Sequence, residues 1–229
     1  MPTPTSTRLA RDIRDHIPGR DRVRGYVVLD DSDSAIWDAA VPYLQVRNND
    51  RHTLYAYGMA RALLDQLPEA DAHIVLPAIL LHDIGWSTVP EHDVLEAIAP
   101  GGGRHDLVRQ HEVEGARIAT GILESIGYDT GLTSTIAAII DGHDTRLEPL
   151  TIEDAIVKDS DKLWRITPDG LDVVCGWFDL RPEEALRLCC ARVHDALHTS
   201  AARSMAGALA AIASIDLTPQ RGAIALDGP

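Results

Sequence analysis

Histidine and aspartate side chains recur on the apolar faces of successive predicted helices in this sequence. The set comprises His52, His82, Asp83, His111, His143 and Asp161. A buried imidazole or carboxylate is costly unless it is paired or binds a metal ion. Imidazole and carboxylate ligands together suit iron, manganese, cobalt or zinc, and the absence of cysteine from the set argues against a structural thiolate site. These residues therefore predict a metal-dependent enzyme.

The dipeptide His-Asp alone is weak evidence, because it occurs five times in the sequence. The pair at His82 and Asp83 differs from the others in its context, with an apolar run before it and Gly85 shortly after it. Adjacent helical residues point about 100° apart, so both can reach one centre only near a helix end. Gly85 is expected to supply the turn there. The histidines expected not to bind metal are His16, His73, His92, His194 and His198.

The spacing of apolar residues predicts the helices that would position these ligands. The expected helices cover residues 33–46, 50–67, 72–82, 106–126 and 131–142, one that opens at Thr151 and carries Asp161, and two more over 182–198 and 201–215. Residues 86–105, which contain Pro90, Pro100 and three consecutive glycines, are predicted to form a long loop. The sequence thus predicts an all-α fold.

The composition fits one helical domain of 229 residues, 45% of them hydrophobic and only one of them Phe. Ala and Leu, which are good helix formers, are prominent among the hydrophobic residues. Without an internal repeat or a Pro/Gly-rich linker, the simplest organisation is an N-terminal arm at 1–32, a domain at 33–216 and a tail at 217–229. Cys175, Cys189 and Cys190 show no paired spacing, so disulfides are not expected.

The charge of the chain argues against two classes of partner. A net charge of −14 does not suit a nucleic-acid or anionic-membrane binder, which needs Lys and Arg. No stretch reaches the roughly 18 uncharged apolar residues of a membrane span, and the N-terminus lacks the apolar segment of a signal peptide. We therefore expect a cytoplasmic protein that acts on a small molecule; the sequence leaves its oligomeric state open.

The order of these histidines and aspartates resembles the HD-domain superfamily of metal-dependent phosphohydrolases. Residues 78–85, AILLHDIG, are similar to the central motif of that superfamily, and residues 158–163, KDSDKL, are similar to the segment that holds its last ligand. The resemblance extends from about residue 49 to residue 164. It implies an HD-domain helical bundle with the metal site between helices.

Two further histidines, His111 and His143, match the pair that dinuclear members of the superfamily place before the final Asp. The resemblance then implies one ion at His52, His82, Asp83 and Asp161, and a second ion at Asp83, His111 and His143, with Asp83 bridging. These would be divalent iron or manganese, with zinc or cobalt as alternatives. The sequence lacks the Glu-Asp pair of the single-metal nucleotidases and the Gly-Tyr-Pro signature of the cyclic-dinucleotide phosphodiesterases, so cyclic dinucleotides are not expected.

The activity that the resemblance implies is hydrolysis of a small phosphate ester or nucleotide. Asp83 and Lys162 are the expected catalytic residues, since Lys162 lies beside Asp161 and could neutralise charge on the transferring group. Arg165, Arg104 and Arg146 are the expected substrate contacts.

Two other functions are compatible with the same residues. Mixed-valence di-iron oxygenases of the inositol-oxygenase or phosphonate-cleaving type use the same ligand order on the same fold, so the ligands alone do not separate the two activities. A phosphonate is accordingly an alternative substrate. A regulatory binding module without activity is less expected, because the ligand set is complete.

Overall fold

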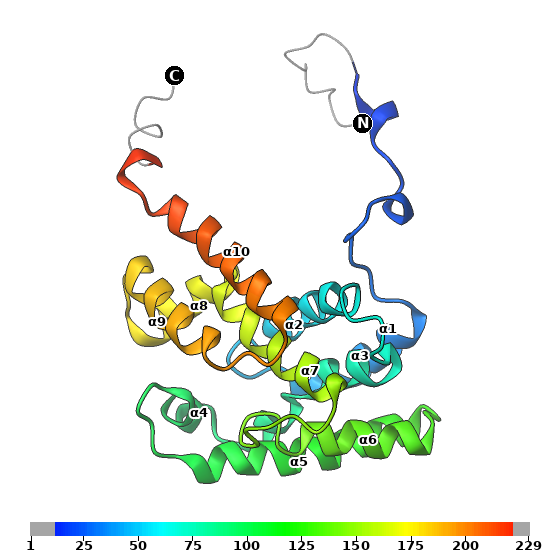
Figure 1. The fold of residues 1–229 in the computed structure, drawn as a ribbon. Helices are drawn as coiled ribbons and strands as arrows, with labels where there is room; N and C mark the ends of the chain where they lie inside the picture. The colour runs from blue at the N-terminus through cyan, green and yellow to red at the C-terminus, as the bar shows by residue number, and fades with distance from the viewer. Residues whose placement is uncertain (1–11, 222–229) are drawn as a thin grey trace, which may run out of the picture.

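The computed structural model describes residues 12–221, and every regular element among them is helical (Figure 1). The α-helices are α1 (Asp31–Ala40), α2 (Asn49–Leu64), α3 (Ala72–Leu81), α4 (Glu91–Ile98), α5 (His105–Ser125), α6 (Thr130–Ile140), α7 (Ile152–Leu163), α8 (Pro168–Phe178), α9 (Pro182–His194) and α10 (Ser200–Asp216). The short 3₁₀ helices are η1 (Arg14–His16), η2 (Arg20–Arg22), η3 (Val41–Tyr43), η4 (Ile84–Thr88) and η5 (Trp164–Ile166). The predicted all-α fold is confirmed.

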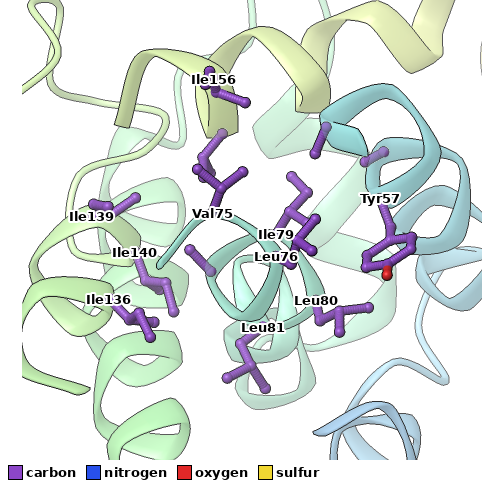
Figure 2. Close-up of a cluster of buried hydrophobic side chains, with 14 of the residues drawn as sticks. Tyr57, Val75, Leu76, Ile79, Leu80, Leu81, Ile136, Ile139, Ile140 and Ile156 are labelled. Atoms are coloured by element: carbon purple, nitrogen blue, oxygen red, sulfur yellow. The ribbon is translucent and has the colours of Figure 1, made fainter. Parts of the chain in front are cut away.

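Helix α3 lies at the centre of the bundle, as its apolar sequence predicts. Every residue from Val75 to Leu81 is buried, and α3 contacts α1, α2, α6 and α7. Ile79 of α3 and Ile136 and Ile140 of α6 belong to the main apolar core, seen in Figure 2. Burial of apolar surface is the main force that assembles such a bundle. The last turn of α3 is therefore held in a fixed place, and the next residue is His82.

The predicted loop over residues 86–105 is wrong in part, because α4 lies within it. Glu91 and Asp93 stand in the first turn of α4, where negative charge is favoured by the helix dipole. Val94 is buried in a second apolar cluster with Trp86 and Leu107, and this packing stabilises the short helix. The glycines and prolines that indicated a loop flank α4 rather than interrupt it.

Helix α8 was not expected from the sequence. Its local signals are a Thr167 side chain that accepts a hydrogen bond from the Gly170 backbone and a proline, Pro168, in the first helical position. Both are favoured at helix N-termini. This helix forms part of the wall beside the candidate site described below.

The ends of the chain are described only in part. Of the predicted arm, residues 1–11 lie outside the described residues, and residues 12–30 are exposed apart from half-buried Leu29. Of the predicted tail, residues 222–229 also lie outside. Helices α1 to α10 span Asp31–Asp216, with α10 directed away from α5 and α6 (Figure 1). The proposed domain limits stay a prediction.

Over residues 12–221, no single helix is long and apolar enough to cross a membrane. Two consecutive segments, Ala72–Thr88 and Glu91–Ile98, are together long and apolar enough for a membrane span, but they are bent by 119° relative to each other. Most of the first segment forms the buried centre of the bundle.

Candidate metal centre

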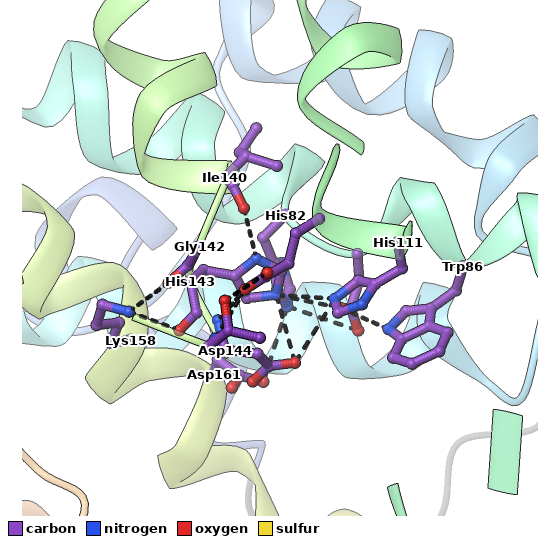
Figure 3. A network of polar contacts seen from close by, with 12 residues as sticks. His82, Trp86, His111, Ile140, Gly142, His143, Asp144, Lys158 and Asp161 are labelled. Carbon is purple, nitrogen blue, oxygen red and sulfur yellow. Dashed lines mark hydrogen bonds and ion pairs between the residues drawn. The ribbon is translucent and has the colours of Figure 1, made fainter. Parts of the chain in front are cut away.

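Five separate segments bring the six predicted ligands together in the middle of the molecule. His52 comes from α2, His82 from the end of α3 and Asp83 from the turn that follows it. His111 comes from α5, His143 follows the end of α6, and Asp161 comes from α7. All six side chains are buried, and Figure 3 shows how several of them face one another. The predicted convergence of the six side chains is present.

One group of side chains gathers around His52 and His82. The Nε2 atoms of these two histidines are 3.0 Å apart. The Oδ1 atom of Asp161 lies 3.3 Å from His52 Nε2 and 3.8 Å from His82 Nε2. Ligand atoms of all three residues lie within 4.8 Å of one another, an arrangement that could hold one metal ion.

A second group gathers around His111 and His143, whose Nε2 atoms are 3.4 Å apart. Asp144, which was not among the predicted ligands, joins them. Its Oδ2 atom lies 3.5 Å from His111 Nε2 and 3.8 Å from His143 Nε2. Asp144 belongs to one of the five His-Asp dipeptides. Its only local signal is its position beside His143, just after α6 has ended, which frees adjacent side chains to point the same way.

The carboxylate of Asp83 lies between the two groups and faces each with a different oxygen. Its Oδ2 atom is 3.3 Å from His52 Nε2 and 3.7 Å from His82 Nε2. Its Oδ1 atom is 3.8 Å from His111 Nε2 and 3.6 Å from His143 Nε2. Asp83 thus connects the two groups of side chains through separate carboxylate oxygens.

Gly85 acts differently from the way the sequence suggested. The turn after α3 is made by Asp83, with φ −102° and ψ 3°, whereas Gly85 lies inside η4 and its φ is not positive. A Cβ atom on Gly85 would collide with the backbone of α5 at His111 and Gly115. Gly85 therefore allows close packing of η4 on α5, which sets the distance between Asp83 and His111.

The protonation of the imidazoles indicates whether these side chains could bind a metal cation. His82 Nδ1 lies 2.8 Å from the Ile79 carbonyl oxygen, and His143 Nδ1 lies 2.9 Å from that of Ile140. A carbonyl oxygen only accepts, so each Nδ1 carries a proton. In the neutral imidazole, each Nε2 is then unprotonated and offers its lone pair to a metal ion. Histidines that bind metals commonly donate their other nitrogen in this way. The lone pairs and carboxylates that meet here fit metal cations.

The pKa values follow the same arrangement. Burial by itself would raise the pKa of Asp83 and of Asp161, but the histidines and cations around them hold both pKa values well below their usual range. Burial lowers the pKa of His111 to about 4. Burial would also lower the pKa of His143, but the carboxylates of Asp144 and Asp83 raise it to about 9. A metal ion at this position would therefore compete with a proton for His143.

A buried lysine holds the segment that carries His143. Lys158 Nζ donates hydrogen bonds of 2.8 Å to the carbonyl oxygens of Gly142 and His143 (Figure 3). It donates a third, also of 2.8 Å, to that of Arg146. Gly142 adopts φ +124°, which only glycine reaches without strain. From the other side, buried Glu112 accepts hydrogen bonds from the backbone of Asp144 and from the residue after it.

Replacement of Lys158 by methionine is expected to lower the free energy of unfolding by about 2–3 kcal/mol. The substitution keeps the volume of the side chain but leaves the carbonyl oxygens of His143 and Arg146 without a donor, while that of Gly142 keeps the backbone N–H of Arg146. An unsatisfied buried group costs about 1–3 kcal/mol. Urea denaturation measures the change. Arg117→Met, which removes only the exposed ion pair with Glu114, should change stability by less than about 1 kcal/mol. Equal effects of the two substitutions would contradict this role of Lys158.

The structure separates the four predicted cationic residues into two pairs. Lys162 Nζ and Arg165 Nη1 lie 3.8 and 3.5 Å from Asp161 Oδ2, and both line a cavity beside the metal centre. Arg104 is not brought there, since it pairs with Asp93 of α4 and Asp106 of α5. Arg146 donates to backbone carbonyls at the end of α6 and to Asp154. Arg104 and Arg146 thus have structural partners and do not line the cavity.

Arg47 is a site residue that the sequence did not indicate. Its guanidinium lies over the rings of Trp86 and Trp177, at 5.1 and 5.3 Å, and its Nη2 atom is 3.3 Å from Asp83 Oδ2. Arg47 and Asn48 both adopt the left-handed conformation, with φ of 43° and 64°. Such backbone strain in residues other than glycine concentrates at functional sites. Arg47 falls in the short gap between two predicted helices, where no periodicity marked it.

Comparison with known proteins identifies the same region. A family model described as the HD domain matches residues 49–166, slightly more than half of the chain. The match begins where α2 begins and ends where η5 ends, so it includes all six predicted ligands and Asp144. No curated protein and no solved structure matches the chain.

Proposed function

The chain belongs to the HD domain family, and on this premise we propose that it is a metal-dependent hydrolase of small phosphate esters or nucleotides. The observation that supports this best is the position of Asp83, with one carboxylate oxygen facing each pair of histidines. Sites that hold two metal ions close together are common in phosphatases and nucleases.

We propose that the two groups of side chains hold two ions. His52, His82 and Asp161 would hold the first ion; His111 and His143 would hold the second; Asp83 would bridge them, and Asp144 would be a further ligand of the second ion. Imidazole and carboxylate ligands without thiolate suit iron or manganese, with zinc and cobalt as alternatives.

When bound, the ions would lower the pKa of a water molecule and neutralise charge on a phosphate group. The chain itself supplies cations for the same substrate. Lys162 and Arg165 line the cavity next to Asp161, where they would donate hydrogen bonds to phosphate oxygens. The guanidinium of Arg47 would keep Asp83 ionised and oriented.

The test is to strip the purified protein of metal, reload it anaerobically with Fe²⁺ or Mn²⁺, and measure both phosphate release and O₂ consumption. The substrates would be a panel of phosphate monoesters, nucleotides and phosphonates. We expect phosphate release from esters that depends on metal and consumes no O₂. Lys162→Met should slow this release without removing metal, since the lysine is not a proposed ligand.

His194→Ala is the matched control, because His194 also precedes an aspartate but is exposed on α9. It should retain both metal and activity. Consumption of O₂ with a phosphonate, and no phosphate release from any ester, would replace the hydrolase with the di-iron oxygenase. If the fully metal-loaded protein turned over none of these substrates, the proposed enzyme would be replaced by a binding module without activity.

A further inference from the structure

A cavity of about 260 Å³ lies directly beside the metal centre. Its polar end is formed by Asp144, Lys162 and Arg165. Because Asp144 lies 3.5 Å from His111, and Arg165 lies 3.5 Å from Asp161, this end borders both groups of proposed ligands. A phosphate bound between the two ions would therefore direct its organic group into this cavity.

The rest of the cavity has a different character. Apart from the exposed Arg192, its other lining side chains carry no charge, and most are apolar. The principal ones are Ile98, Val174, Trp177, Phe178, Leu188 and Val193. They come from α8, α9 and the end of α4. Two of these helices, α4 and α8, were not predicted from the sequence. The cavity thus carries charged side chains of both signs at the end beside the proposed metal ligands, and it is mostly hydrophobic elsewhere.

We infer that the substrate carries its phosphate or phosphonate on a compact apolar group, such as a small aryl or branched alkyl group, and that this group occupies the cavity. The inference rests on the proposed function and narrows it. A sugar or a ribose would bury hydroxyl groups against Val174, Phe178 and Leu188, and a buried polar group without a hydrogen-bond partner is costly. A volume of about 260 Å³ is also below the roughly 300–1,000 Å³ of most ligand sites, so the cavity suits a group much smaller than a dinucleotide.

Binding of two phosphonates tests this inference without turnover. Isothermal titration of the metal-loaded, anaerobic protein should give phenylphosphonate an affinity at least about tenfold higher than methylphosphonate. The basis is that even one methylene in a hydrophobic pocket changes discrimination by about 10–200-fold. Both ligands present the same anionic head to the metal centre, so their difference reports on the cavity.

Ala196→Trp, which fills the cavity from its edge, should remove the preference while methylphosphonate still binds. The matched control is Ala191→Trp, at an exposed position of α9 that does not line the cavity, and it should keep the preference. If Ala196→Trp does not fold, Phe178→Ala provides the second test, because it removes part of the apolar wall and should weaken phenylphosphonate selectively.

The outcomes separate this inference from the proposed hydrolase. Equal affinities of the two phosphonates, or a preference that survives both substitutions, would overturn the apolar pocket even if phosphate esters are hydrolysed. A preference that depends on Ala196 and Phe178, in a protein that hydrolyses no ester, would support the pocket and overturn the hydrolase.

Discussion

Asp83→Asn is expected to remove both metal ions and to abolish activity, the largest effect of any single substitution in the chain. The asparagine keeps the shape of the side chain but loses its charge and one acceptor oxygen, so it no longer offers an anionic oxygen to each pair of histidines. Loss of groups that merely orient ligands costs about 10–100-fold in metal affinity. Loss of a ligand that both ions share should therefore lower the metal affinity by more than about 100-fold at each of the two positions.

Elemental analysis of the purified variant measures the metal content, and the midpoint of thermal unfolding gives a second readout. Metal added to the wild-type protein should raise that midpoint, because an ion that binds only the folded state stabilises it. The Asp83→Asn midpoint should not respond. Asp195→Asn, in the exposed His194-Asp195 dipeptide, is the control and should behave as wild type. Two ions retained in Asp83→Asn would exclude Asp83 as the bridge.

The sequence could predict the six converging side chains because a regular helix ties spacing to direction. His52 and His111 lie within helices, where neighbouring apolar residues define the buried face. Arg47 and Asp144 lie where helices are interrupted. Their directions depend on left-handed backbone or on a tight turn, which periodicity does not describe, and so neither was expected.

The cationic residues show a related limit. Lys162, Arg165 and Arg146 all follow a predicted ligand closely in sequence, yet only the first two face the cavity. Arg146 is drawn instead to carbonyl oxygens at the end of α6, a demand that depends on where that helix ends. The distance along the chain could not separate these roles, because the competing partners come from other elements.

The second large effect concerns the second ion. His111→Ala and His143→Ala should each lower the metal content from two ions per chain to one, and activity should fall steeply. Their Nε2 atoms face Asp83 Oδ1 and Asp144, on the opposite side of Asp83 from His52. Removal of either imidazole leaves the first group of ligands intact, so the ion between His52 and Asp161 should remain.

Elemental analysis of freshly purified, anaerobic protein decides between one ion and two, and His52→Ala provides the reciprocal control. That variant should lose the first ion and keep the side chains around His111 intact. Buried imidazoles without a partner would be costly, which is why the second group is expected to bind an ion of its own. A wild-type ratio near one, unchanged by excess iron or manganese, would assign His111 and His143 to contact with substrate. The two-ion mechanism would then have to be abandoned, while the single ion beside Asp161 could still support hydrolysis.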